Sequence, residues 1–401
     1  MRAMPLPKLA VASIAANFAD QMMLALLPLL LVAGGASAQT ISTVVAAHAA
    51  AWLIVSLPAG AYADAISRRA IMTAGASAIL AASAVGAAAL TMEFGPPWLL
   101  ASTAFVIASG VVMLILSVFA LVPRSVGATK LASANAFLEF GRAGACIAAP
   151  IVAAALVTRH LGAFGFGLAF AGGLLALMAV SGLPREQMAA RTKVALLHSI
   201  RDGAAFVVAE PILRAIALCA IAWNSAFFAL TAVFAPYAAA ELGMSIVEIG
   251  RAWSIYGIGL LLGSLAAAPM INRLPIGFMF VFGPAVSCVA VVLLIAGARV
   301  GVTWPVSVAF FALGFGPMTW LVLQTSVRQI VTPNALLGRV GATISTAIYG
   351  VRPLGALAAG GVAASFGAPA ALWLAAGLFF VSCIFLMLSP AARLRTMPTA
   401  A

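Results

Sequence analysis

A few polar and charged side chains lie inside long apolar stretches of this sequence, where they could carry chemistry. Asp20 stands in the stretch NFADQMML, with Asn17 three residues before it and Gln21 directly after it. Asn17 and Asp20 share one face of a helix, because side chains three residues apart are neighbours there. Burial disfavours the charged form of a carboxylate, so Asp20 is a candidate for proton coupling or substrate contact. The alternative is a structural hydrogen bond between helices.

Two arginines in later apolar stretches are further candidates. Glu139 and Arg142 are three residues apart and can pair on one helix face, either as a structural ion pair or as a proton or substrate site. An offset of 210 residues relates Arg142 to Arg352, and the same offset relates Pro123 to Pro333. The shared offset favours two repeated halves, although chance in a sequence rich in Ala and Gly would also explain it.

Aromatic and amide side chains form a third group of candidates. Such side chains suit a cavity for bulky amphipathic solutes, whereas ordinary packing is the alternative for each of them. The candidates for a cavity lining are Gln21, Trp223, Asn224, Trp320 and Gln324.

The histidines and cysteines indicate neither a metal site nor a catalytic cluster. His48, His160 and His198 are far apart in the sequence, and we interpret His48 as a packing or hydrogen-bonding residue. The four cysteines lie in apolar runs without a CxxC spacing, which predicts buried free thiols. We therefore expect no metal, no catalytic residues and no enzymatic activity.

The elements that hold these residues must be membrane spans. The chain has 401 residues, of which 65% are hydrophobic and only 7% charged, and its mean hydropathy is +1.18. Soluble domains contain roughly 45–50% apolar and about 25% charged residues. The composition predicts an integral membrane protein, and the net charge of +12 then reflects cytoplasmic loops rather than binding of nucleic acid.

Twelve apolar stretches are long enough to cross a membrane, which takes about 20 residues. They predict an all-α fold of twelve transmembrane helices in two pseudo-symmetric bundles of six. The expected parts are an N-terminal bundle over 1–183, a cytoplasmic linker over 184–211 and a C-terminal bundle over 212–401. Most Lys and Arg residues fall on one side of this topology, which predicts that both termini are cytoplasmic.

One loop carries a motif of defined spacing. The segment SLPAGAYADAISRRA, residues 56–70, falls between the second and third spans and contains Gly60, Asp64, Arg68 and Arg69 in the pattern GxxxDxxxRR. With this motif in this loop, the sequence resembles the major facilitator superfamily, although Ser67 stands where the family usually has Gly. In that family the loop grips the start of the eleventh span, here near Arg339. The resemblance thus implies a latch that gates the conformational cycle.

Segments 121–142, 200–218 and 332–361 look like the drug and siderophore exporter branch of this superfamily, which includes macrolide-efflux and enterobactin-export proteins. The resemblance implies export of a small amphipathic molecule in exchange for protons. We further expect a monomer in contact with membrane lipid, and the high content of Ala and Gly suits a bacterial inner membrane. The sequence contains no GxxxxGK[ST] motif, so we expect a proton gradient rather than ATP or a cofactor to supply the energy. The alternative is an importer or lipid flippase of the same fold, moving a siderophore, a nutrient or a lysophospholipid.

Overall fold

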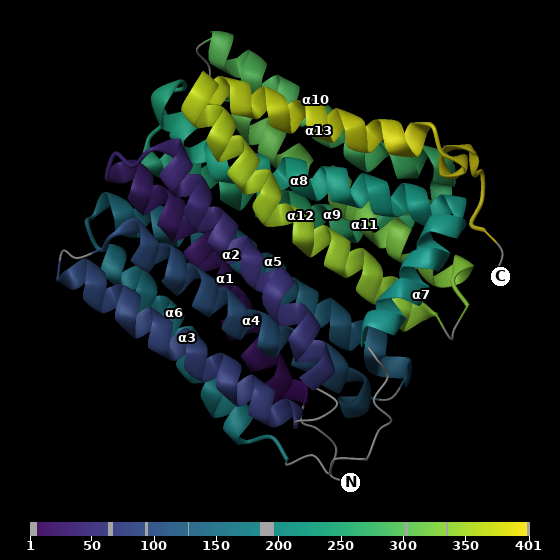
Figure 1. The fold of residues 1–401 in the computed structure, drawn as a ribbon, viewed down its shortest axis with the longest axis horizontal. Helices are drawn as coiled ribbons and strands as arrows, with labels where there is room; N and C mark the ends of the chain where they lie inside the picture. The colour runs from purple at the N-terminus through teal and green to yellow at the C-terminus, as the bar shows by residue number, and fades with distance from the viewer. Residues whose placement is uncertain are drawn as a thin grey trace. The chain divides into compact units, whose positions relative to one another are not determined.

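The protein is described by a computed structural model over residues 6–62, 67–92, 95–126, 128–184, 196–300, 304–333 and 336–398. Within these residues the structure is helical throughout (Figure 1). Twelve of the helices are long and apolar enough to cross a membrane. Helices suit this composition because each backbone N–H and C=O finds its partner inside the same segment, as the hydrocarbon core demands.

The helices of the N-terminal half follow one another closely along the chain. They are α1 (Leu6–Ala33), α2 (Ala38–Tyr62), α3 (Arg68–Thr91), α4 (Pro97–Ser125), α5 (Ala128–Thr158) and α6 (Gly162–Ser181).

The C-terminal half contains six further long helices and two short elements. They are α7 (Leu196–Ala209), α8 (Pro211–Ala240), α9 (Ile246–Arg273), α10 (Ile276–Val300), α11 (Trp304–Val331), α12 (Leu337–Phe366), α13 (Ala368–Met387) and the short 3₁₀ helix η1 (Pro390–Arg393). α7 is shorter than the spans and lies within the charged segment predicted to be a linker.

The chain divides into two compact units. The first comprises Met1–Thr192 with Ser245–Ser254, and the second comprises Lys193–Met244 with Ile255–Ala401. The first residues of α9 therefore pack with the first unit, a feature that the apolar pattern does not indicate. The division of the sequence into 1–183, 184–211 and 212–401 stays a prediction.

In the first unit, α1 lies among α2, α4, α5 and α6, while α3 packs between α4 and α6. The backbones of α3 and α4 approach each other closely, because a side chain at Gly75 would collide with the backbone oxygen of Gly110. Small residues permit such backbone contact between helices in a membrane. The position of α1 among its neighbours explains why Asn17 and Asp20 are buried.

In the second unit, α8 packs against α12 and α13, and α10 packs against α11 and α13. α7 lies against α12 and α8. α12 ends at Gly367, whose φ of 84° lies in the left-handed region that a glycine adopts without strain, and α13 begins directly afterwards. Apolar side chains of α8, α10, α11, α12 and α13 form one core that includes Phe280, Trp320 and Leu386.

Candidate functional site

The central feature of the first unit is a buried pair of ionisable side chains midway along α1 and α2. Nε2 of His48 lies 3.1 Å from Oδ1 of Asp20. The two residues are only 4% and 7% exposed. Gln21 donates a hydrogen bond from Nε2 to the other carboxylate oxygen, Oδ2 of Asp20, at 3.1 Å. Asp20 therefore accepts a hydrogen bond from Gln21 on its own helix and faces His48 on the neighbouring helix.

The contact between His48 and Asp20 is within ion-pair distance, but its geometry does not make a hydrogen bond. Nδ1 of His48 is buried and finds no hydrogen-bond partner within the described residues. An imidazole and a carboxylate therefore face each other in a site with little access to solvent.

This pair was not predicted from the sequence, because the apolar pattern does not reveal that His48 faces Asp20. The sequence contained one indication of this contact: Asp20 and His48 are polar residues near the middle of two consecutive spans. Asn17 takes no part in the pair, because its Nδ2 donates to the Ser13 carbonyl oxygen at 2.8 Å on its own helix.

Glu139 and Arg142 form a second ion pair on α5. Nε of Arg142 lies 2.7 Å from Oε2 of Glu139, and the side chains are 31% exposed for Arg142 and 43% for Glu139. The i, i+3 spacing thus brings them together as its geometry allows. Their greater exposure distinguishes this pair from the enclosed Asp20 and His48.

Arg352 on α12, which the predicted repeat relates to Arg142, has different surroundings. Its Nε donates to Oδ1 of Asn224 on α8 at 3.0 Å. Its guanidinium lies over the rings of Phe228, at 5.1 Å, and Tyr349, at 4.9 Å. The offset of 210 that relates Arg142 to Arg352 also relates Glu139 to Tyr349. One arginine therefore pairs with a carboxylate, whereas the other contacts aromatic faces and an amide oxygen.

Aromatic side chains extend from Arg352 along α8. Trp223 stacks on Phe227 with ring centres 5.1 Å apart, and Phe227 contacts Tyr256 of α9 at 5.4 Å. The indole nitrogen of Trp223 donates to Oγ of Ser287 at 2.9 Å, which satisfies its polar group. We call Trp223, Phe227, Phe228, Tyr256 and Tyr349 the aromatic patch. It offers flat apolar faces beside a fixed cation.

Two predicted cavity residues lie in a different environment. Trp320 belongs to the apolar core of the second unit and is 7% exposed. Gln324, 5% exposed, donates from Nε2 to Oγ1 of Thr325 at 3.0 Å. Nε1 of Trp320 and Oε1 of Gln324 are buried and find no hydrogen-bond partner among the described residues. A cavity role for both residues stays a prediction.

The predicted gating loop is only partly visible. Asp64 lies outside the described residues, and so do the surroundings of Gly60. Arg69 donates from Nη2 to the carbonyl oxygen of Ser181 at the end of α6, at 2.7 Å, and Arg68 is partly buried at the start of α3. These contacts join two helix ends of the first unit, and the latch itself stays a prediction.

Arg339, which the resemblance linked to that loop, has a partner that the sequence did not indicate. Its Nη1 lies 2.7 Å from Oδ2 of Asp202 on α7. Beside this pair, a side chain at Gly203 would overlap the backbone oxygen of Arg339 and Oγ1 of Thr343. α7 is therefore attached to the first turn of α12 by an ion pair and by direct backbone contact.

Groups of three or more metal-ligating side chains do not occur among the described residues. The four cysteines are free.

Solved transporter structures share the fold of this chain. A POT family transporter in complex with a thioalcohol-conjugated peptide superposes with a TM-score of 0.77 at 14% identity, over 95% of each chain. A D-xylose-proton symporter gives a TM-score of 0.74 at 14% identity, over 96% of this chain and 97% of the other. These likenesses define the twelve-helix fold of the major facilitator superfamily and confirm the fold expected from the sequence.

Residues 5–400 match the family of transmembrane secretion effectors, and the chain belongs to this major facilitator family. Together with its twelve candidate spans, this membership makes the chain a multi-pass membrane protein of the family. The enterobactin exporters EntS of Shigella boydii serotype 18 and Escherichia coli O1:K1 are each 26% identical to it over 229 residues, covering 56% of this chain and 53% of theirs. The chain thus matches about half the length of these curated relatives.

Proposed function

We propose that this protein is a proton-coupled exporter of a small amphipathic molecule, and that the Asp20 and His48 pair is its proton site. The observation that carries the proposal is their approach to 3.1 Å in a buried site. A pair that gains or loses a proton changes its net charge inside a medium where charge is costly. Such a change can bias a conformational equilibrium, which is what coupling to a proton gradient requires.

The proposed substrate contacts are Arg352 and the aromatic patch. Flat rings bind apolar and aromatic parts of a solute, while a guanidinium binds a carbonyl, carboxylate or similar acceptor. Arg352 lies near the middle of α12, and transporters of this kind hold their substrates near the bilayer midplane. The Glu139 and Arg142 pair is the corresponding polar group of the first unit, with a role in substrate or proton handling.

Export is supported by the secretion effector family and by the partial likeness to enterobactin exporters. We propose a monomer in the cytoplasmic membrane with both termini in the cytoplasm, in keeping with the distribution of Lys and Arg along the chain. The loop residues Gly60, Asp64, Arg68 and Arg69 are proposed to act with Arg339 as the gate.

The proposal is tested by transport into everted membrane vesicles with an imposed proton gradient. The screened compounds are a cationic dye, a macrolide and a catechol siderophore, with right-side-out vesicles and a fluorescent lysophospholipid as the tests of import and flipping. Accumulation in everted vesicles that collapses with a protonophore is the expected result. Gradient-driven uptake only in right-side-out vesicles, or lipid movement alone, would replace export with one of the two alternatives.

A further inference from the structure

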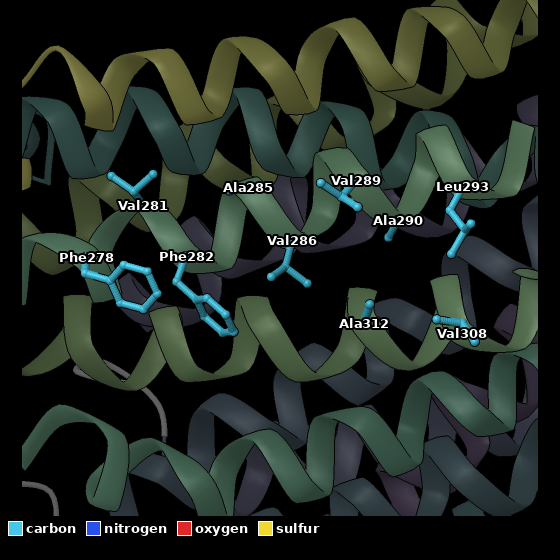
Figure 2. A pocket seen from close by; sticks show the side chains of 10 residues that line it. All are labelled: Phe278, Val281, Phe282, Ala285, Val286, Val289, Ala290, Leu293, Val308 and Ala312. Carbon is cyan, nitrogen blue, oxygen red and sulfur yellow. The ribbon is translucent and has the colours of Figure 1, made fainter. Parts of the chain in front are cut away.

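An apolar groove follows the outer side of α10 in the second unit, next to α11. It encloses about 310 Å³, near the lower end of the roughly 300–1,000 Å³ typical of small-molecule pockets. Figure 2 shows its lining, which runs from Phe278 and Phe282 near the start of α10 to Leu293 near its end. Val308 and Ala312 of α11 close the other side.

The length and chemistry of the groove fit a hydrocarbon chain. The lining consists of Phe, Val, Ala and Leu side chains, none of which offers a polar group. From Phe278 to Leu293 the helix advances about 22 Å at 1.5 Å per residue, more than the roughly 15 Å that one leaflet contributes to the hydrocarbon core. Several lining residues face outward, Val289 being 67% and Phe278 51% exposed. A lipid chain can therefore enter from the side.

Three arginines belong to the two chain segments that lie next to the start of α10, which is the end of the groove where Phe278 lies. Arg273 is in the last turn of α9, three residues before α10 begins, and Arg393 and Arg395 flank Leu394. The backbone N–H of Gly277 donates to the carbonyl oxygen of Leu394 at 2.6 Å, which fixes this C-terminal segment against the first turn of α10. A side chain at Gly277 would overlap the carbonyl oxygen of Ala392, so the approach requires glycine.

The positive charge of these arginines has no acidic residue near it in the sequence. All three arginines are exposed, and the chain contains no Asp or Glu after Glu248. Leu394 and Met397 pack against the apolar core, so the segment that carries Arg393 and Arg395 is anchored. A fixed basic cluster next to an apolar groove matches an anionic headgroup that continues into an acyl chain.

We infer that this groove is a binding site for an anionic phospholipid, with an acyl chain along α10 and the headgroup phosphate at Arg273, Arg393 and Arg395. The site shares no residue with the aromatic patch or with the Asp20 and His48 pair. Lipid bound there would support the contact between the C-terminal segment and the start of α10.

The test is native mass spectrometry of the purified full-length protein, titrated with phosphatidylglycerol or with phosphatidylcholine of the same chains. We expect tighter binding of phosphatidylglycerol, and a loss of about fivefold in affinity for each Arg→Gln substitution at the cluster. The triple Arg→Lys variant should retain most of the preference. Arg159→Gln, at an exposed arginine after α5, is the matched control.

Val289→Trp tests the groove, since the larger side chain would occupy it from an outward-facing position. It should weaken binding of phosphatidylglycerol, whereas Leu174→Trp on α6, at a residue 42% exposed, should not. Thermal unfolding and monodispersity verify that each variant is folded. Equal affinity of the wild type for both lipids, or undiminished binding by the triple Arg→Gln or Val289→Trp variants, would overturn the inference.

Discussion

His48 of α2 approaches Asp20 of α1 to 3.1 Å, with both residues less than a tenth exposed. Two ionisable groups so deeply enclosed cannot both be charged without strong mutual compensation, because desolvation penalises each charge. The proposal that this pair is the proton site therefore gives the most specific predictions about transport.

Replacing Asp20 by Asn should abolish gradient-driven accumulation of substrate. The amide keeps the size of the carboxylate but cannot exchange a proton, so coupling is lost while substrate can still cross. The substitution also removes the charged group that lies 3.1 Å from buried His48, which should lower the free energy of unfolding by about 1–3 kcal/mol because the buried imidazole then has a poorer environment. Vesicle uptake with and without a gradient measures the first effect, and thermal unfolding measures the second.

Substrate exchange without a gradient separates coupling from structure, because Asp20→Asn should retain it and a misfolded protein would not. His48→Gln should lose coupling as well, and the double variant should be no worse than either single one, as expected of residues that act as a unit. Glu248→Gln at the exposed start of α9 is the control. Wild-type gradient dependence in Asp20→Asn would remove this residue from the coupling mechanism.

Arg352→Gln should raise the half-saturating concentration of substrate by roughly ten- to hundredfold, the equivalent of losing one hydrogen bond to a charged group. Arg352→Lys keeps the charge but loses the planar group that lies over Phe228 and Tyr349, so it should recover only part of the affinity. The measurement is the concentration dependence of the initial transport rate. Exposed Arg251 supplies the control Arg251→Gln, and unchanged half-saturation in Arg352→Gln would exclude substrate contact.

Asp202→Asn should loosen α7 from α12 with little change in overall stability. The side chains of Asp202 and Arg339 are 31% and 38% exposed, and ion pairs of such exposure contribute about 0.2–1 kcal/mol. Hydrogen exchange of the α7 amides should accelerate, while the unfolding temperature stays nearly constant. The reversed pair Asp202→Arg with Arg339→Asp should restore protection, and failure to do so would show that backbone packing at Gly203 alone holds α7.

Gly110→Leu should destabilise the first unit strongly, because any side chain there meets the backbone oxygen of Gly75. Overpacking of this kind lowers the free energy of unfolding by about 1–3 kcal/mol or more. Gly167→Leu on α6 is the matched control, since no atom lies within 4 Å of the position where its side chain would begin. Thermal unfolding in detergent should distinguish the two, and equal stability would contradict the close crossing of α3 and α4.

Much of the fold follows from local properties of the chain. Long apolar runs predict the twelve spans because the hydrocarbon core excludes unpaired backbone groups, and the motif around residues 60–69 points to the superfamily. The spacing of Glu139 and Arg142 likewise predicts their contact, since a helix brings residues three apart together. The α7 helix was harder to predict from the sequence, because the charged residues around it are typical of a loop.

The sequence by itself indicated a helical membrane protein that resembles the major facilitator superfamily, and it predicted Asp20, Glu139, Arg142 and Arg352 as charges within the spans. Only the tertiary structure decided that Asp20 meets His48, that Arg352 lies over aromatic rings and that Arg339 binds Asp202. Each of these contacts involves side chains from two different helices, so it depends on which face each helix turns toward its neighbour. Hydropathy sets the length of a span but not its rotation about its axis, which is fixed by packing against its neighbours.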